Sequence, residues 1–265
     1  MHVLDDSNTV FNIRFIRRSA LINKLALHAA AILCLMAHNA IAQSTGPFPA
    51  GAVDARTIAV QEKVEALFEA KEYKRALFIY EHELAPLGDK YAQYMVGFMN
   101  LTGTGVAENP VVASAWYRLA AERANPEFLT VRDQLVDSLS DIDRGRSDQL
   151  YLQLRQRYSD VAILLRLIKE DLDSMTARTG SRVVGASGQV MIVDPRTGFG
   201  VSGDNISRQV RRRLKMRLEF VTQAIGQPDL DTDIDKVDIN ELEASVGAYV
   251  SRLNDQPQSG VQADR

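Results

Sequence analysis

The sequence is poor in the side chains on which much protein chemistry depends. Its 265 residues include one cysteine, Cys34, and four histidines, of which only His82 lies beyond residue 38. A disulfide bond, a thiolate zinc site, an iron–sulfur cluster or a two-histidine site needs more of these side chains than residues 43–265 contain. The sequence therefore excludes most thiol and metal chemistry from this region.

The first 42 residues have the pattern of an export signal. Basic residues precede an apolar run over residues 25–37, which leads into Ala40-Ile41-Ala42. A positive segment, a short apolar segment and an A-x-A site make up a secretory signal peptide. A retained membrane anchor is the alternative, but it needs roughly 20 apolar residues and this run has about 13. We therefore expect cleavage between Ala42 and Gln43, and a periplasmic mature protein of a Gram-negative-type cell envelope.

The charge of the remaining chain is mildly negative. Residues 43–265 carry 27 basic and 32 acidic residues, so their net charge is about −5. A general affinity for nucleic acid is not expected from this balance. No phosphate-binding loop, nucleophile elbow, H-E-x-x-H motif or dinucleotide fingerprint is present, and a lone His82 beside Glu81 and Glu83 is typical of a surface or packing residue. We expect no cofactor, no metal and no enzymatic activity.

After a Pro- and Gly-containing linker at residues 43–56, apolar residues recur at helical spacing. They predict helices over residues 57–71, 90–101, 110–123 and 125–139, and a further helix between a turn at Glu72-Tyr73 and Pro86, with Pro110 and Pro126 in first-turn positions. An offset of 36 residues superposes Tyr80 on Trp116, Ala85 on Ala121, Gly88 on Ala124 and Ala92 on Phe128. Internal repetition of this length indicates stacked helical hairpins. The predicted fold is mainly α, with a short α-solenoid of hairpins at residues 57–140.

The second hairpin carries a motif that can be compared with a known family. The motif comprises Ala92, Gly97, Gly103, Gly105, Val106, Ala113, Trp116, Tyr117, Ala120 and Ala121. With these residues in register, the chain from Ala92 to Phe128 resembles one full Sel-one-like repeat, a subclass of the tetratricopeptide-type helical repeats. The chain departs from the family pattern at Val96, Asn100, Asn109 and Ala124, where Leu, Tyr, Asp and Gly are usual. The resemblance implies a surface that binds other envelope proteins or peptides.

Elementary packing gives these motif residues structural roles. Small residues at Gly97 and at Ala120-Ala121 let two antiparallel helices approach closely, and Gly103 with Gly105 supplies positive-φ positions in a short loop. Trp116 and Tyr117 would fill the space between neighbouring hairpins. Repeats of this kind are stable only when several units stack, so the partial array needs a cap.

The region after residue 140 is expected to supply that cap. A pattern close to a heptad predicts one long helix over residues 144–178, within a segment 141–180. The helix would cap the solenoid or pair with a second copy to form a homodimer. Capping is favoured, because Leu164 and Leu167 broaden the apolar stripe beyond a two-stranded seam.

Residues 181–254 predict a small α/β element. Short β-rich runs over residues 182–184, 189–193 and 199–201 surround a turn at Pro195 to Gly198, which predicts a β-hairpin or small sheet. Two helices follow, over residues 207–225 and 238–253, and residues 255–265 form a polar tail that we expect to be disordered.

The helix at residues 207–225 has an apolar face beside a basic stripe made of Arg208, Arg211, Arg212 and Lys215. Such a stripe suits an anionic lipid, a glycan or an acidic protein surface. An aspartate-rich segment follows at residues 229–238, and it would neutralise the stripe within the chain or across a dimer. Calcium binding is a third interpretation, although the Gly and Glu of an EF-hand loop are missing.

The expected function is therefore that of a non-enzymatic periplasmic repeat protein that binds an envelope protein or peptide. The alternative is attachment to anionic lipid or glycan through the basic stripe. The dependence of binding on salt distinguishes these two functions. Attachment through the region from Arg208 to Arg217 should weaken steeply with ionic strength, whereas binding in a repeat groove should not.

Overall fold

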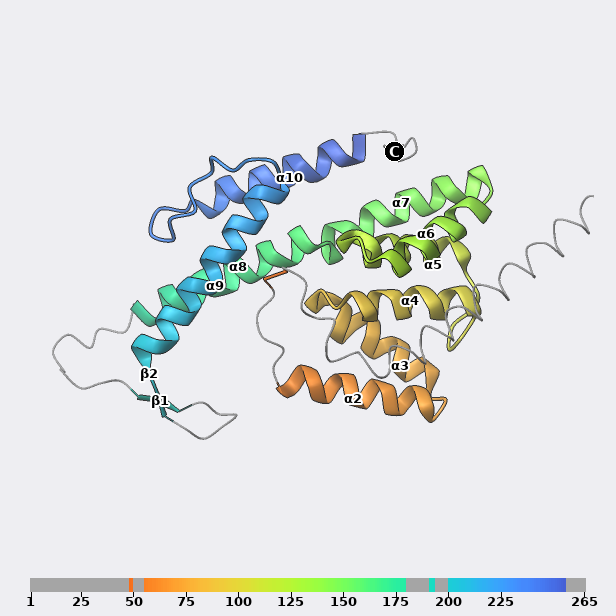
Figure 1. Ribbon diagram of the computed structural model, residues 1–265, viewed down its shortest axis with the longest axis horizontal. Helices are drawn as coiled ribbons and strands as arrows, with labels where there is room; N and C mark the ends of the chain where they lie inside the picture. The colour runs from red at the N-terminus through yellow and green to blue at the C-terminus, as the bar shows by residue number, and fades with distance from the viewer. Residues whose placement is uncertain (1–47, 50–54, 180–190, 194–199, 256–265) are drawn as a thin grey trace, which may run out of the picture. The chain divides into compact units, whose positions relative to one another are not determined.

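The structure is a computed structural model that describes residues 48–49, 55–179, 191–193 and 200–255 (Figure 1). Within these residues the protein is mainly helical, as the sequence predicts. The chain divides into two compact units. Of the described residues, unit 1 holds 55–159, and unit 2 holds 48–49 together with those from Asp160 onward. The predicted signal peptide with its predicted cleavage site at Ala40, Ala42 and Gln43, and the tail beyond Asp255, lie outside the described residues.

Unit 1 contains six helices within its described part. They are α2 (Ala55–Glu69), α3 (Tyr73–Ile79), α4 (Lys90–Thr102), α5 (Pro110–Ala120), α6 (Pro126–Ser138) and α7 (Asp141–Tyr158). The start of α2 lies two residues before the predicted one, so the predicted linker is shorter than residues 43–56. Lys71, at a φ of 60°, lies in the turn that follows α2.

Side-chain caps explain where the helices of unit 1 begin. Asp89 accepts a hydrogen bond from the backbone N–H of Ala92 at the start of α4, and Asn109 accepts from Val111 and Val112 at the start of α5. Asn125 and Ser140 cap α6 and α7 in the same manner. Each cap satisfies a backbone donor that the helix itself leaves without a partner.

The predicted 36-residue repeat has a counterpart in the backbone. The helix α3 continues through a π-helical turn (Tyr80–Leu84) into a 3-10 turn (Ala85–Leu87), and α5 ends in a 3-10 turn (Ala121–Arg123). Each 3-10 turn is followed by a left-handed residue, Gly88 at a φ of 80° and Ala124 at 55°. The next residue in each case, Asp89 or Asn125, caps the following helix. The same sequence of turn, left-handed residue and cap thus occurs twice at the predicted offset.

The core of unit 1 centres on α5, which packs against α4, α6 and α7. The ring of Tyr94 stacks on Phe128 from α6 with centroids 4.9 Å apart, and Trp116 meets Tyr158 from α7 at 5.0 Å. Tyr94 and Trp116 are at most 2% exposed. Aromatic pairs of this geometry add about 0.5–1.5 kcal/mol each beyond the burial of their area.

The prediction of one long helix over residues 144–178 is wrong. The chain forms two helices, α7 and α8 (Asp160–Thr179), because Ser159 adopts extended backbone with a ψ of 155°. Ser159 stands directly before α8, where Ser is favoured as a cap, and Asp160 suits the positive end of the helix dipole. The first helix packs on α5, as a cap would, whereas the second belongs to unit 2.

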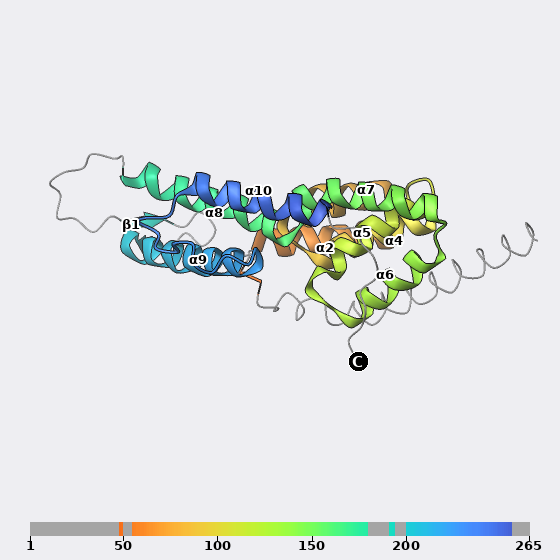
Figure 2. The ribbon, with the colours of Figure 1, turned by 90° about the horizontal axis from the view of Figure 1, so that it is seen from above.

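Unit 2 is built around α8, which contacts both α9 (Gly203–Ala224) and α10 (Ile239–Asp255) (Figure 2). Its core joins Leu164 and Ile168 of α8 to Leu214 and Leu218 of α9 and to Leu242 of α10. Two short segments, β1 (Met191–Val193) and β2 (Gly200–Ser202), pair antiparallel. The turn between them and the run at residues 182–184 lie outside the described residues, so a β-hairpin or larger sheet stays a prediction.

Candidate functional site

The repeat-motif residues are mostly buried in unit 1. Gly97 lies in α4 against the ring of Tyr117, where a β-carbon would be 2.7 Å from Cδ1 and 2.8 Å from Cε1 of that ring. Because such a distance is far inside a van der Waals contact, only glycine fits this ring position without movement. The structure confirms the close helix approach predicted for Gly97. Ala92, Ala113, Trp116, Tyr117, Ala120 and Ala121 are all at most 4% exposed.

The loop between α4 and α5 also needs its glycines. Gly103 and Gly105 have φ values of 71° and 77°, as predicted. A β-carbon at Gly105 would lie 2.7 Å from the carbonyl carbon of Tyr73 at the start of α3. The loop therefore packs against the preceding hairpin. Val106 departs from the buried set, because it is 36% exposed.

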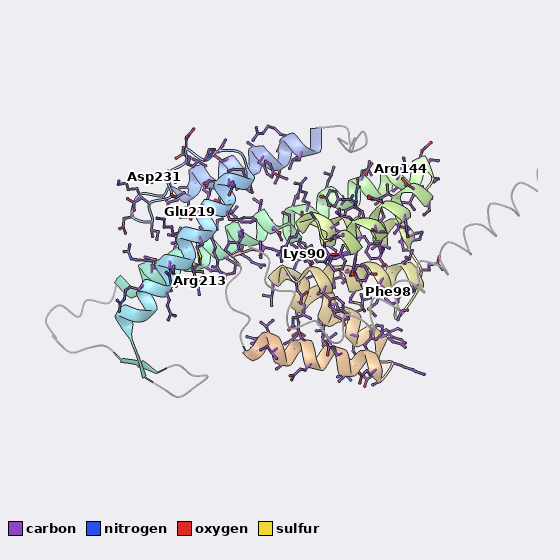
Figure 3. The ribbon with its side chains drawn as sticks, in the orientation of Figure 1. Lys90, Phe98, Arg144, Arg213, Glu219 and Asp231 are labelled. Carbon is purple, nitrogen blue, oxygen red and sulfur yellow. The ribbon has the colours of Figure 1, made fainter. Side chains whose placement is uncertain are left out.

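A buried polar network that the sequence did not suggest joins α4 to its neighbours. Lys90, which is labelled in Figure 3, is 7% exposed. Its Nζ donates to Oε2 of Glu122 at 2.7 Å, to the carbonyl of Leu119 at 3.0 Å and to Oε1 of Gln93 at 3.1 Å. Gln93 in turn donates to the carbonyl of Tyr158 at 3.0 Å. All these partners belong to backbone or side chains of unit 1, which indicates a structural role for the network.

The four residues of the predicted basic stripe are exposed on α9, and Arg211 and Lys215 lie close to acidic side chains. Arg211 Nη1 lies 3.1 Å from Asp235 Oδ1, and Lys215 Nζ lies 3.8 Å from Glu219 Oε1. Arg208 and Arg212 are also exposed. The pair of Arg211 and Asp235 supports the interpretation that the aspartate-rich segment neutralises part of the stripe within the chain.

Two carboxylates of the aspartate-rich segment accept hydrogen bonds from the segment's own backbone. Asp231 accepts from the backbone N–H of Asp233 at 2.8 Å, and Asp233 accepts from that of Asp235 at 3.2 Å. The pKa of Asp233 is lowered by that backbone hydrogen bond and by Lys236. In the part of the chain that the structure describes, no group of three or more His, Cys, Asp or Glu side chains is placed to hold a metal ion.

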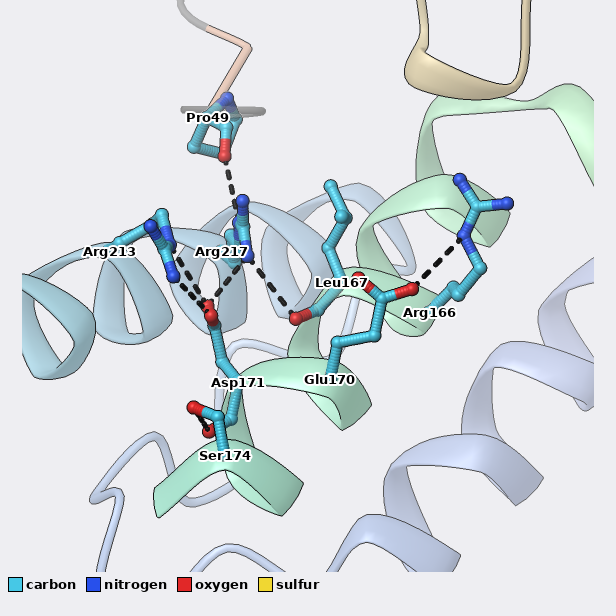
Figure 4. Close-up of polar contacts among 8 residues, drawn as sticks. All are labelled: Pro49, Arg166, Leu167, Glu170, Asp171, Ser174, Arg213 and Arg217. Carbon is cyan, nitrogen blue, oxygen red and sulfur yellow. Dashed lines mark hydrogen bonds and ion pairs between the residues drawn. The ribbon is translucent and has the colours of Figure 1, made fainter. Parts of the chain in front are cut away.

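Among the residues that the structure describes in unit 2, the most strongly buried charges form a cluster that sequence reasoning missed. Asp171 of α8 lies between Arg213 and Arg217 of α9 (Figure 4). Arg213 reaches both carboxylate oxygens, Oδ2 through Nε at 3.2 Å and Oδ1 through Nη2, and Arg217 Nη1 donates to Oδ2 at 2.6 Å. The side chains of Asp171 and Arg217 are 6% and 4% exposed. One carboxylate thus holds two guanidinium groups.

The two arginines differ in their electrostatic surroundings. The hydrogen bond to Asp171 raises the pKa of Arg213. Burial lowers the pKa of Arg217, Asp171 opposes that shift, and the nearby charge of Arg213 adds to it. A buried cation is tolerated only when its donors are satisfied. Arg217 meets this need with two further acceptors, the carbonyls of Leu167 at 3.2 Å and Pro49 at 3.0 Å.

The acceptor at Pro49 comes from a segment that the sequence assigned to a linker. Phe48 contacts Phe220 of α9 with ring centroids 5.8 Å apart and ring planes at 89°, and it packs against the core of unit 2. Residues 48 and 49 are therefore part of unit 2. The linker interpretation of residues 43–56 is wrong at these two positions.

His82 lies at the surface, as the sequence predicts. Its ring meets that of Phe78 with centroids 4.6 Å apart, and Phe78 is 58% exposed. Phe78 is thus a large aromatic side chain on the outside of the first hairpin of unit 1.

Comparisons with known proteins add no identification, because no protein-family model, curated protein or solved structure matches this chain. None of the helices in the described ranges is both long and apolar enough to span a membrane.

Proposed function

We propose that this is an exported helical-repeat protein of the Sel-one-like type, whose unit 1 binds another envelope protein or a peptide without catalysing a reaction. The observation that carries the proposal is the repeated turn at Gly88 and Ala124. Both positions follow a 3-10 turn, both are left-handed, and both precede a capping side chain. Recurrent hairpins of this kind build extended surfaces that serve mainly for binding.

The use of the motif residues supports a binding role. Trp116, Tyr117 and the small residues around them are buried among other side chains of unit 1, so they stabilise the packed hairpins, and a partner would contact other side chains on the outer faces. Among the described residues of unit 1, Phe78 is the largest strongly exposed apolar side chain, and its neighbour His82 extends the aromatic surface. Exposed aromatic residues are enriched where proteins meet one another.

The first test is in-cell crosslinking and affinity capture from envelope fractions, with three forms of the full chain. The forms are the unsubstituted protein, Phe78→Ser, and a quadruple variant with Arg208, Arg211, Arg212 and Lys215 changed to Ser. We expect discrete proteins to be captured by the unsubstituted and quadruple forms, and at least one of them to be lost with Phe78→Ser.

Attachment through α9 predicts the opposite pattern. The unsubstituted protein would then recover only lipid, glycan or copies of itself. The quadruple variant would recover none of these, and the amount recovered by the unsubstituted protein would fall steeply as salt is added. That result would overturn the repeat-surface proposal. The ion pair between Arg211 and Asp235 argues against attachment, because it already compensates one charge of the stripe.

A further inference from the structure

Unit 2 binds a short segment from a distant part of the sequence. Arg217 Nε donates to the carbonyl oxygen of Pro49 at 3.0 Å across 168 residues of chain (Figure 4). The adjacent Phe48 meets Phe220, one turn further along α9, in an edge-to-face contact. One polar and one apolar contact thus hold two consecutive residues.

The guanidinium of Arg217, which donates to Pro49, is held in place by further hydrogen bonds within unit 2. Asp171 and the carbonyl of Leu167 both accept from Nη1 of Arg217, and Arg213 holds Asp171 through two hydrogen bonds. These contacts orient the guanidinium so that its Nε–H is directed at Pro49. Asp171 is therefore a positioning residue, and Arg217 and Phe220 are the groups that touch the segment.

The two contacts indicate which kind of peptide segment such a site can bind. Proline has no backbone N–H and fixes φ near −65°, and it favours an extended conformation in the residue before it. An aromatic–proline pair thus presents a ring and an accepting carbonyl at low entropic cost. Phe220 contacts the ring, and Arg217 donates to the carbonyl.

We propose that Arg217 and Phe220, positioned by Asp171, form a docking site for an aromatic–proline segment, and that its occupant is Phe48–Pro49 of the same chain. The described part of unit 1, residues 55–159, lies between Pro49 and Asp160 in the sequence, so the chain on both sides of this part belongs to unit 2. The repeat unit becomes an insertion in a discontinuous second unit, closed by a non-covalent clasp. This inference is independent of the function proposed for unit 1.

The clasp can be tested in the full chain by inserting a recognition sequence for a specific protease between Gly51 and Ala52. After cleavage, we expect the N-terminal fragment to co-elute with the rest of the protein under native conditions. Phe48→Ala should weaken this association by about tenfold or more, since it removes the ring contact. Phe78→Ala is the matched control, because it removes an exposed aromatic ring from unit 1 and should leave the association unchanged. Release of the unsubstituted fragment as readily as the Phe48→Ala fragment would overturn the proposal.

A second measurement does not depend on the inserted site. A labelled peptide with the sequence of residues 43–52 is titrated into the full-length Phe48→Ala protein and into the unsubstituted protein, and its anisotropy is followed. We expect binding to Phe48→Ala, at least tenfold weaker binding to the unsubstituted protein, and loss of binding when Phe in the peptide is replaced by Ala. Equal binding of the two peptides, or none, would contradict the site. A dimer that becomes monomeric with Phe48→Ala would show that a second copy supplies the segment, and would overturn the assignment of the occupant.

Discussion

The ring of Tyr117 lies directly against the backbone of Gly97, so that the two helices α4 and α5 approach one another at a point where a β-carbon would be 2.7 Å from the ring. Tyr117 is 1% exposed, and the centroid of its ring lies 5.1 Å from that of Tyr94. The glycine and the tyrosine of the repeat motif thus act as one packing unit. A binding role for either residue would need this contact to open.

Gly97→Ala should therefore destabilise unit 1. Overpacking of a filled core costs about 1–3 kcal/mol, and the higher helix propensity of Ala offsets at most about 1 kcal/mol of it. Gly145→Ala in α7 is the matched control, because nothing lies within 4 Å of a β-carbon at that position. Denaturant unfolding of both variants measures the difference. A Gly97→Ala protein as stable as Gly145→Ala would show that the Tyr117 ring moves aside without cost.

Ala124→Gly should stabilise the protein by about 0.5–1 kcal/mol, because an L-residue with a side chain pays to adopt the left-handed conformation that follows a helix end. Ala124 has a φ of 55° and is exposed, so the substitution removes little packing. The equivalent Gly88 provides the reciprocal test. Gly88→Ala should lower the free energy of unfolding, and an increase there would contradict the equivalence of the two turns.

Much of unit 1 could be predicted from the sequence because its signals are local. Asn109 and Asn125 precede Pro110 and Pro126, and each pair marks a helix start that the structure confirms. The break at Ser159 was missed because it does not interrupt the apolar periodicity: Tyr158 and Val161 keep the spacing on either side. Capping by a single Ser is a weaker sequence signal than an apolar pattern that continues over residues 144–178.

The arginine cluster of unit 2 was missed for a different reason. Arg217 falls at helical spacing from Val210, Leu214 and Val221, so it lies on the apolar face of α9 and not on the basic stripe. Asp171 likewise falls at helical spacing from Leu164 and Ile168, so it lies on the apolar face of α8. An acidic residue on the apolar face of one helix and a basic residue on that of another could have suggested a buried ion pair between Asp171 and Arg217. Nothing local to residues 48 and 49, however, indicates a contact with Arg217.

The burial of this cluster predicts that Asp171→Asn is strongly destabilising. Removal of one partner leaves the Arg217 guanidinium buried without its counter-charge, and such changes cost about 3–5 kcal/mol. Asp235→Asn is the control, since it breaks an ion pair whose side chains are 46% and 69% exposed, and exposed pairs contribute about 0–1 kcal/mol. Thermal and denaturant unfolding of the two variants gives the comparison. Similar stabilities would mean that water reaches the Asp171 cluster.

The buried tyrosines of unit 1 predict a loss of stability at alkaline pH. Burial raises the pKa of Tyr94 from 10.0 to about 12, and it also raises those of Tyr80, Tyr91 and Tyr117. A tyrosine is neutral when protonated, so below pH 10 the folded and unfolded chains bind the same proton and no stability is lost.

Above pH 10 the unfolded chain releases this proton while the folded chain keeps it, and the free energy of unfolding falls by up to about 1.4 kcal/mol per pH unit for each such tyrosine. For Tyr94 the loss extends from pH 10 to about 12. Tyrosinate absorbance and helical circular dichroism, recorded in one titration, should therefore change together for these residues. Tyr94→Phe removes one titrating group and should make the decline shallower. Ionisation of every tyrosine near pH 10 with the helical signal intact would contradict the burial of these rings, because a hydroxyl that titrates at its ordinary pKa in the folded protein is one that water already reaches.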